Sequence, residues 1–265
     1  MSRRVADAFA RAAQEHRAAL IGYLPAGFPT PELSVRLFTA MVDAGVDIIE
    51  VGLPYSDPLM DGPVIQQAVN QALDAGTTPD VVLDIVRQIT LAGATAVVMT
   101  YWNPIERYGV EEFAARLEAA GGTGVIAPDL TPEESGDWAA ACDRHGVDRI
   151  FLVAPSSTQE RIASIVAVTS GFVYAASTMG VTGMRTSVSS GAEGLVARTR
   201  AATGLPIAVG LGVSTREQAA EVAAYADGVI VGSAFVRCVL DATDDQAAIA
   251  AVSALARELS AGVRR

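Results

Sequence analysis

The chain has 265 residues, of which 51% are apolar and 18% are charged, a composition typical of a folded globular protein with a large core. Its formal net charge of −11 would repel nucleic-acid phosphates and anionic lipid, which disfavours both as main partners. No apolar run reaches the roughly 20 residues that span a bilayer and the N-terminus lacks a secretory apolar core, so we expect a cytoplasmic protein with no membrane segment.

The order of apolar and amphipathic segments predicts a repeating β-then-α chain. Met1–Arg17 has amphipathic spacing and predicts a surface helix. Apolar, β-rich runs then predict eight strands: Ala19–Tyr23, Asp47–Val51, Ala96–Thr100, Gly124–Ala127, Arg149–Val153, Phe172–Ala175, Pro206–Val209 and Gly228–Val231. Helical spacing predicts helices at Glu32–Ala44, Pro79–Ala92, Glu111–Ala120, Pro132–His145, Thr158–Thr169, Ala192–Thr203 and Thr215–Tyr225.

The strands read as near-continuous apolar runs, which is typical of a parallel sheet covered on both faces. Either a closed barrel or an open doubly wound sheet has this property. The barrel is favoured by about eight βα repeats, by the lack of a composition break and by functional-looking residues after the strands. We therefore predict an α/β protein with a single (β/α)8 TIM barrel domain over residues 1–265.

Two connections differ from the short loops usual between strand and helix. Gly52–Pro79 reads as a long loop containing Pro and Gly after the second strand, and long structured loops of this kind are usually functional. Ser177–Gly191 is rich in Gly, Ser and Thr and has no hydrophobic anchor, which predicts a mobile lid.

Two carboxylates lie near the end of the second strand. Glu50 is embedded in an apolar run, where burial disfavours the charged form, raises the pKa and suits a proton shuttle near neutral pH. Asp61 lies on the following loop, which can fold back over the same barrel mouth, and carboxylates in different surroundings can divide acid and base roles. The alternatives are a Glu50 paired with Lys or Arg and an Asp61 that only forms the turn before Gly62.

Glycine-rich segments follow three of the later strands. They read GVTG at 180–183, GLGVS at 210–214 and GSA at 232–234. Glycines there let backbone N–H groups converge on an anion, and Ser233 adds a hydroxyl at the start of a final helix. The pattern predicts a phosphate site after the seventh and eighth strands, and the alternative is ordinary turn glycines.

Apolar side chains at strand ends predict a flat substrate pocket, although core packing is the alternative explanation. These residues are Tyr23, Met99, Tyr101, Tyr174 and Leu211.

Other chemistry finds little support. His16 and His145 lie in polar helical stretches without further ligands at metal-binding spacing, so we expect no metal site. Cys142 and Cys238 form no close pair and are expected to be reduced thiols. The sequence contains no P-loop, no dinucleotide fingerprint in a first βα unit and no nucleophile elbow.

Glu50–Pro58, followed by Asp61-Gly62-Pro63, resembles the signature of the tryptophan synthase α subunit family. The similarity continues through Pro128–Leu130 and Gly180–Gly183 and through Gly210, Gly212, Gly232 and Ser233, so it covers nearly the whole chain. It implies a lyase of tryptophan biosynthesis that cleaves indole-3-glycerol phosphate to indole and glyceraldehyde 3-phosphate by retro-aldol chemistry, with no cofactor in this chain.

The resemblance also implies roles for individual residues. Glu50 matches the family's acid–base residue, which protonates indole C3 and takes the proton of the side-chain hydroxyl, and Asp61 matches the carboxylate that holds the indole N–H. Asp57 and Thr182 match a loop pair that closes over substrate. Positions that match substrate-binding residues are Tyr174, beside Glu50, and the phosphate-binding positions Gly183, Gly212, Gly232 and Ser233.

The implied partner is a pyridoxal-phosphate-dependent β subunit, to which indole passes through a tunnel in an αββα heterotetramer. Two departures bear on lid dynamics and pocket fit: Thr178 stands where some relatives carry an arginine, and Leu211 where some carry an aromatic residue. The alternative readings are another phosphate-binding barrel, such as an isomerase of a phosphoribosyl intermediate, and a non-catalytic regulatory subunit. The presence of both Glu50 and Asp61 argues against the regulatory reading.

Overall fold

A computed structural model describes residues 4–176, 190–210 and 212–264. The described residues form nine strands, all paired in parallel: β1 (Ala19–Pro25), β2 (Ile48–Gly52), β3 (Ala96–Met99), β4 (Gly124–Ile126), β5 (Asp148–Ile150), β6 (Leu152–Val153), β7 (Val173–Ala176), β8 (Ile207–Gly210) and β9 (Gly228–Val231). The described helices are α1 (Val5–Gln14), α2 (Pro31–Asp43), α3 (Pro63–Asp74), α4 (Pro79–Leu91), α5 (Trp102–Tyr108), α6 (Val110–Ala119), the 3-10 turn η1 (Pro132–Glu134), α7 (Gly136–His145), α8 (Gln159–Val168), α9 (Ser190–Arg200), α10 (Arg216–Ala223), α11 (Ser233–Leu240) and α12 (Asp245–Gly262).

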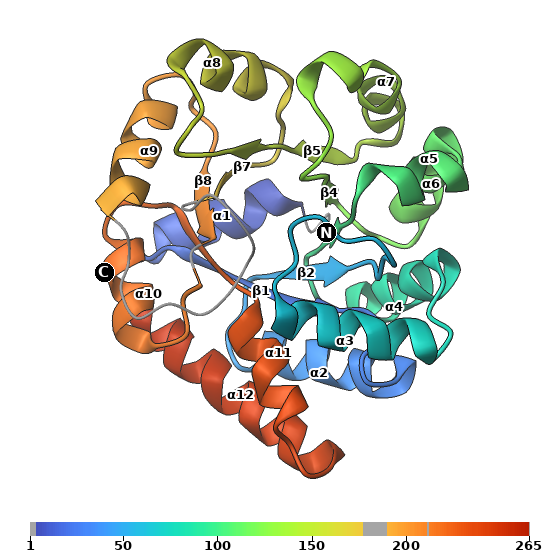
Figure 1. Ribbon diagram of the computed structural model, residues 1–265. Helices are drawn as coiled ribbons and strands as arrows, with labels where there is room; N and C mark the ends of the chain where they lie inside the picture. The colour runs from blue at the N-terminus through green and yellow to red at the C-terminus, as the bar shows by residue number, and fades with distance from the viewer. Residues whose placement is uncertain (1–3, 177–189, 211, 265) are drawn as a thin grey trace.

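The sheet closes on itself through one interrupted strand. Its order is β5-β4-β3-β2-β1-β9-β8-β7-β6, and the two end segments are separated in the chain only by Phe151. The Phe151 carbonyl accepts the Tyr174 N–H at 3.1 Å. The fifth predicted strand is thus two segments that pair with opposite neighbours, and the sheet is the predicted (β/α)8 barrel with its helices outside (Figure 1). The open doubly wound alternative is excluded.

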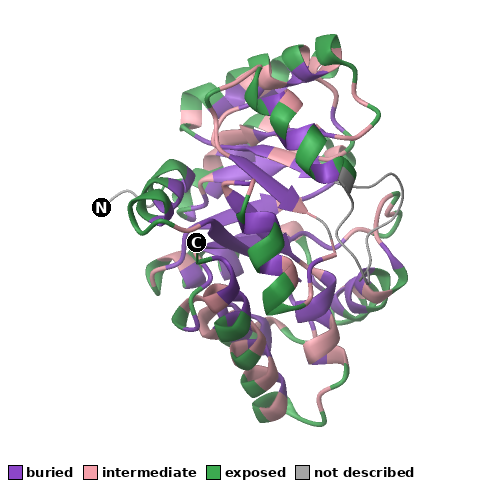
Figure 2. Cartoon of the chain, turned by 90° about the vertical axis from the view of Figure 1, so that its left-hand side faces the viewer, coloured by how far each residue is buried: buried purple, intermediate pink, exposed green. Residues whose placement is uncertain are grey.

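Alternate residues of each strand point into the barrel, as the strand repeat of two requires. The interior cluster contains Ile21, Ile48, Val97, Ile126, Ile150, Phe172, Ala208 and Ile230. The residues between them, such as Leu20 and Ile49, belong to the larger cluster between sheet and helices. Figure 2 shows the result: the strands are mostly buried, and most exposed residues lie on the outward faces of the helices.

Helix α1 closes the N-terminal end of the barrel. Its buried residues Val5, Ala8, Phe9 and Ala12 lie on one helical face and join the interior cluster. The ring of Phe9 packs against that of Phe172 at 5.4 Å between centroids. The amphipathic periodicity therefore predicted the helix correctly, but its apolar face fills the barrel end instead of lying on the surface.

The segment predicted as one long loop, Gly52–Pro79, contains helix α3, so that prediction was wrong in part. The buried residues of α3 are Ile65, Ala68, Val69 and Ala72, and their spacing places them on one helical face. Pro63 occupies the first turn, where its missing N–H costs nothing. Pro63 and Pro79 mark the starts of α3 and α4, and the connection from β2 to α3 is only about ten residues long.

Two other helices, α5 and α12, were not predicted, and the predicted helix at 132–145 begins later than expected. It opens with η1, and the α-helix starts only at Gly136. The remaining predicted strands and helices are present, with ends that differ by at most three residues.

Candidate active site

Glu50 lies in the middle of β2 and points into the barrel, because it shares a strand face with Ile48 of the interior cluster. Its side chain is 1% exposed, and Oε2 has no hydrogen-bond partner in the described structure. Burial alone raises the pKa of Glu50 to about 8. No described Lys or Arg forms an ion pair with it, so the pairing alternative finds no partner in this part of the chain.

Tyr23 stands beside Glu50 on the neighbouring strand, in direct register with it. Its ring occupies space left by two glycines: a Cβ atom at Gly52 would lie 2.6 Å from the hydroxyl oxygen, and one at Gly232 would lie 3.3 Å from Cδ1. Burial raises the pKa of Tyr23 well above its usual value, and the charges of Asp61 and Glu50 raise it further. The Tyr23 hydroxyl therefore lies in the field of both carboxylates.

Asp61 lies at the end of the loop after β2 and is half-buried. Its Oδ1 accepts a hydrogen bond from the Tyr101 hydroxyl at 3.2 Å, and its backbone carbonyl accepts one from Gln66 Nε2 at 2.7 Å. Burial raises the pKa of Asp61, and the bond from Tyr101 opposes this rise. The carboxylate thus bonds a side chain at the end of the neighbouring strand β3, a contact that the turn-forming alternative does not require.

Tyr101 is predicted as a pocket residue, but its contact with Asp61 was missed. The same hydroxyl accepts the Met60 N–H at 2.9 Å, so one oxygen holds two consecutive residues of the loop. Behind Tyr101, the Trp102 N–H donates to both oxygens of Asp129, at 2.9 and 3.1 Å. Polar residues after three successive strands thus meet in one network, and only their positions at strand ends could have signalled it.

Tyr174 and Met99 lie on the inward face of their strands, next to the interior cluster. The Tyr174 hydroxyl fills the space where a Cβ at Gly210 would lie. Burial raises the pKa of Tyr174, and the charge of Glu50 adds to the rise. The structure therefore brings Tyr23, Met99 and Tyr174 to the same mouth as Glu50.

The described phosphate-site candidates lie at the ends of two adjacent strands. Gly210 is in register with Ile230, so Gly212 and Gly232 each follow two residues further along. Gly212 has a φ of +67°, a conformation that favours glycine. Gly232 is the N-cap of α11 and, as a glycine, has no side chain to cap this end, so the first-turn N–H groups and the positive end of the helix dipole lie at the mouth next to the buried Ser233.

Of the remaining predicted site residues, the structure describes Asp57. Asp57 is exposed, and its carboxylate accepts the Ser56 hydroxyl at 2.6 Å. Gly183, Thr182, Thr178 and Leu211 lie outside the described residues, as does most of the predicted lid. Within the described residues, no group of His, Cys, Asp and Glu has the arrangement of a metal site, and no helix is long and apolar enough to cross a membrane.

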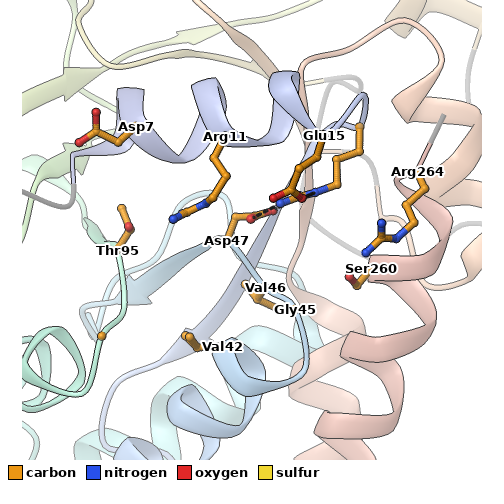
Figure 3. Close-up of a pocket in the computed structure, with 12 residues that line it drawn as sticks. Asp7, Arg11, Glu15, Val42, Gly45, Val46, Asp47, Thr95, Ser260 and Arg264 are labelled. Carbon is orange, nitrogen blue, oxygen red and sulfur yellow. Dashed lines mark hydrogen bonds and ion pairs between the residues drawn. The ribbon is translucent and has the colours of Figure 1, made fainter.

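A second concave surface, of about 700 Å³, lies at the opposite end of the barrel under α1 (Figure 3). It is lined by three arginines and three carboxylates: Arg11, Arg17, Arg264, Asp7, Glu15 and Asp47. Their charges balance, and Arg17 binds Asp47 at 2.5 and 2.8 Å. This surface is a polar contact region between the two ends of the chain. Glu50 and Asp61, whose pKa values are raised, lie at the other end of the barrel.

The mouth of the barrel thus combines the Glu50 carboxyl, which is mostly protonated near pH 7, with the Asp61 carboxylate, which is hydrogen-bonded and half-buried. Such a pair can donate a proton at one atom of a substrate and stabilise positive charge at another. The N-terminus of α11 adds a place for an anion across the mouth. The geometry fits acid–base chemistry on a phosphorylated substrate.

Comparison with known proteins points to one family. A family model described as tryptophan synthase alpha chain matches residues 9–264. The tryptophan synthase alpha chain of Thermobifida fusca is 62% identical over 258 residues, covering 96% of each chain. That of Acidothermus cellulolyticus is 60% identical over 261 residues, covering 98% of this chain and 97% of the other. A chain of Mycobacterium tuberculosis tryptophan synthase matches with a TM-score of 0.94 and 53% identity, covering 99% of this chain and 98% of that one.

Proposed function

The chain belongs to the tryptophan synthase alpha chain family, whose members are lyases of tryptophan biosynthesis, and from this we propose that Glu50 and Asp61 carry out the cleavage of indole-3-glycerol phosphate. The observation that carries the proposal is the buried carboxyl of Glu50, which forms no ion pair with any described Lys or Arg and whose pKa burial raises to about 8. A group with this pKa can both give and take a proton near neutral pH.

Glu50 acts twice in the proposed reaction. Its neutral carboxyl first donates a proton to indole C3, which leaves an electron-poor ring. The resulting carboxylate then takes the proton of the hydroxyl next to the ring, a C=O bond forms there, and the C–C bond to the ring breaks with its electrons returning to C3. Indole and glyceraldehyde 3-phosphate are released, and Glu50 is again protonated.

Asp61 stabilises the positive charge that develops at the indole nitrogen. A carboxylate can accept the indole N–H and neutralise this charge, so it lowers the energy of the protonated intermediate. The half-buried position of Asp61 supports this role, because its charge is screened less than that of a fully exposed carboxylate.

The substrate is held at its two ends. We place the phosphate at the backbone N–H groups of Gly183, Gly212 and Gly232 with Ser233, which is supported by the N-terminus of α11, where the N-cap is a glycine. The indole ring lies against a pocket formed by Tyr23, Met99, Tyr174 and Leu211. Binding at both ends orients C3 towards Glu50.

The family works with a β subunit, and the finer assembly is part of the proposal. We infer an αββα heterotetramer in which pyridoxal phosphate belongs only to the β subunit and this chain needs no cofactor. The loop 53–60, with Leu59 75% exposed, contributes to the partner surface, and Asp57 and Thr182 close over the substrate. The setting is a single barrel domain acting in the cytoplasm.

The test is the release of indole from indole-3-glycerol phosphate, measured with and without a β subunit. We expect release by the chain, with a higher rate when the partner is present. Turnover of a phosphorylated sugar without indole release would point to an isomerase instead. Binding to a β subunit without any turnover would make the chain a regulatory subunit.

A further inference from the structure

Asp61 depends on another residue for its position, because it lies on a loop and not on a strand. The loop is fixed at its start, where the Leu53 N–H donates to the Met99 carbonyl at 2.9 Å. At its end, the Gln66 side chain holds the Asp61 carbonyl at 2.7 Å. Neither contact involves the carboxylate, which must be oriented correctly to accept the indole N–H.

The hydroxyl of Tyr101 contacts the Asp61 carboxylate and acts both as a hydrogen-bond donor and as an acceptor. It accepts the Met60 N–H at 2.9 Å and donates to Asp61 Oδ1 at 3.2 Å. Tyr101 is the one described side chain that bonds the Asp61 carboxylate, and it does so at Oδ1. We propose that Tyr101 is a positioning residue, which fixes the Asp61 carboxylate and keeps it ready to accept the indole N–H.

Tyr101 is itself held firmly, which a positioning residue requires. It is 6% exposed, it is the N-cap of α5, and its ring packs on that of Tyr55 at 5.5 Å between centroids. The N–H of the next residue, Trp102, is held by both oxygens of Asp129. The hydroxyl therefore projects from a fixed part of the barrel rim onto the loop.

The electrostatics agree with this geometry. Burial raises the pKa of Tyr101 to about 12, so the hydroxyl keeps its proton and remains a donor at neutral pH. Donation to Asp61 favours the ionised carboxylate and lowers its pKa against the effect of burial. Among described residues, Tyr101 at the end of β3 and Tyr23 on β1 are the titratable groups whose pKa the charge of Asp61 raises, and the charge of Glu50 also acts on Tyr23.

The inference rests on the role proposed for Asp61, and the test separates the two. Tyr101→Phe keeps the ring and removes only the hydroxyl. Since hydrogen bonds to charged groups are worth a factor of about 10 to 100, we expect kcat to fall by that amount. We also expect the acidic limb of the pH–rate profile, where Asp61 becomes protonated, to move to higher pH. Binding of glycerol 3-phosphate, which lacks the indole ring, should change little.

Two further variants complete the experiment. Tyr108→Phe is the matched control, because Tyr108 lies on α5 and donates to Asp80 at 2.7 Å on the outer surface. It should leave the rate and the pH profile unchanged. Incorporation of 3-fluorotyrosine at position 101 keeps the shape and makes the hydroxyl a stronger donor, so the acidic limb should move to lower pH.

Opposite shifts of the acidic limb in the two variants at position 101 support the positioning role, and a purely structural tyrosine would not produce them. If the limb stays in place in both, Tyr101 only ties down the loop and the inference is overturned. Should Tyr101→Phe fail to fold, the fluorotyrosine protein decides alone. Asp61→Asn is measured in the same assay. Full activity of Asp61→Asn would contradict the proposed function of Asp61. An inactive Asp61→Asn together with normal kinetics of Tyr101→Phe would contradict only the positioning role of Tyr101.

Discussion

Tyr23 on β1 and Glu50 on β2 are partners in the parallel register, and the Tyr23 ring fills the gap above Gly52 on the Glu50 strand. The aromatic neighbour helps to keep water from Glu50, and no described cation replaces that water. The carboxyl therefore keeps its proton at a pH where an exposed glutamate would be ionised.

Replacing Glu50 by glutamine tests the proton shuttle. Glu50→Gln keeps the shape and the hydrogen-bonding capacity but cannot transfer a proton. General acid–base groups contribute about 10² to 10⁴ in rate, and because one group here serves two transfers we expect a loss at the upper end. The measurement is indole release in the presence of a β subunit. A variant that retains more than about a tenth of the normal rate would rule out the shuttle.

The same substitution should change stability in a pH-dependent way. The pKa of Glu50 is about 8 in the fold and near 4.5 when unfolded, so between these values the folded state holds a proton that the unfolded state has lost. Stability therefore falls as pH rises through this window, and Glu50→Gln removes the fall. We expect the variant to be more stable by about 1–3 kcal/mol at neutral pH, with no gain near pH 4. Urea unfolding of the isolated chain at several pH values provides the check, and a difference that does not vary with pH would contradict it.

The Asp61→Asn substitution tests whether the negative charge of Asp61 or only its hydrogen bond contributes to catalysis. Asp61→Asn can still accept from the indole N–H but cannot neutralise the positive charge that develops there, so it should fold normally and lose about 10²- to 10³-fold in kcat. Steady-state kinetics with a β subunit and thermal unfolding measure the two effects. Near-normal turnover would leave Asp61 as a residue that only shapes the loop.

Gly212 tests the backbone phosphate site. Gly212→Val should raise KM about 10-fold or more, because a side chain would block the approach of the anion to the N–H groups. Gly76→Val is the matched control: Gly76 also has a positive φ, of +81°, but nothing lies within 4 Å of its Cβ position. Valine is strained at both positions because both have a positive φ, so an equal rise of KM in both variants would assign the effect to strain.

The ion pair at the opposite end of the barrel should matter for stability alone. Arg17 and Asp47 have side chains that are 9% and 7% exposed, and Asp47 also accepts the Leu20 N–H at 2.9 Å. Arg17→Ala leaves this carboxylate buried and unpaired, which costs about 3–5 kcal/mol. Arg36→Ala, which removes an exposed pair with Asp245, should cost less than about 1 kcal/mol. Equal losses in denaturant unfolding would show that burial of the Arg17 pair has no special effect.

The sequence predicted what depends on local pattern. Glu50 was predicted as a site residue because a charged residue inside IIEVG contradicts its apolar neighbours, and the strands were predicted correctly because they are apolar on both faces. The sequence did not predict α3, since Pro63 and Gly62 were read as loop residues when they mark a helix start.

Features that depend on barrel closure were beyond sequence reasoning. The bond between Tyr101 and Asp61 joins two loops that are distant in the chain, and only the pairing of β2 with β3 brings them together. The glycines after the strands were interpreted only as anion-binding or turn residues. Gly52 and Gly210 also leave space for the rings of Tyr23 and Tyr174, a packing relation that depends on neighbouring strands.

The pairing of β1 with β9 has a consequence for how the protein emerges from the ribosome. β1 is among the first elements made, yet one of its hydrogen-bonding edges pairs with β9, which is made near the end. Until then that edge is open to pairing with other chains, as on any uncovered edge strand. The nascent chain therefore passes through a long period in which a chaperone would protect it, and a premature stop before Gly228 would leave a fragment prone to aggregate.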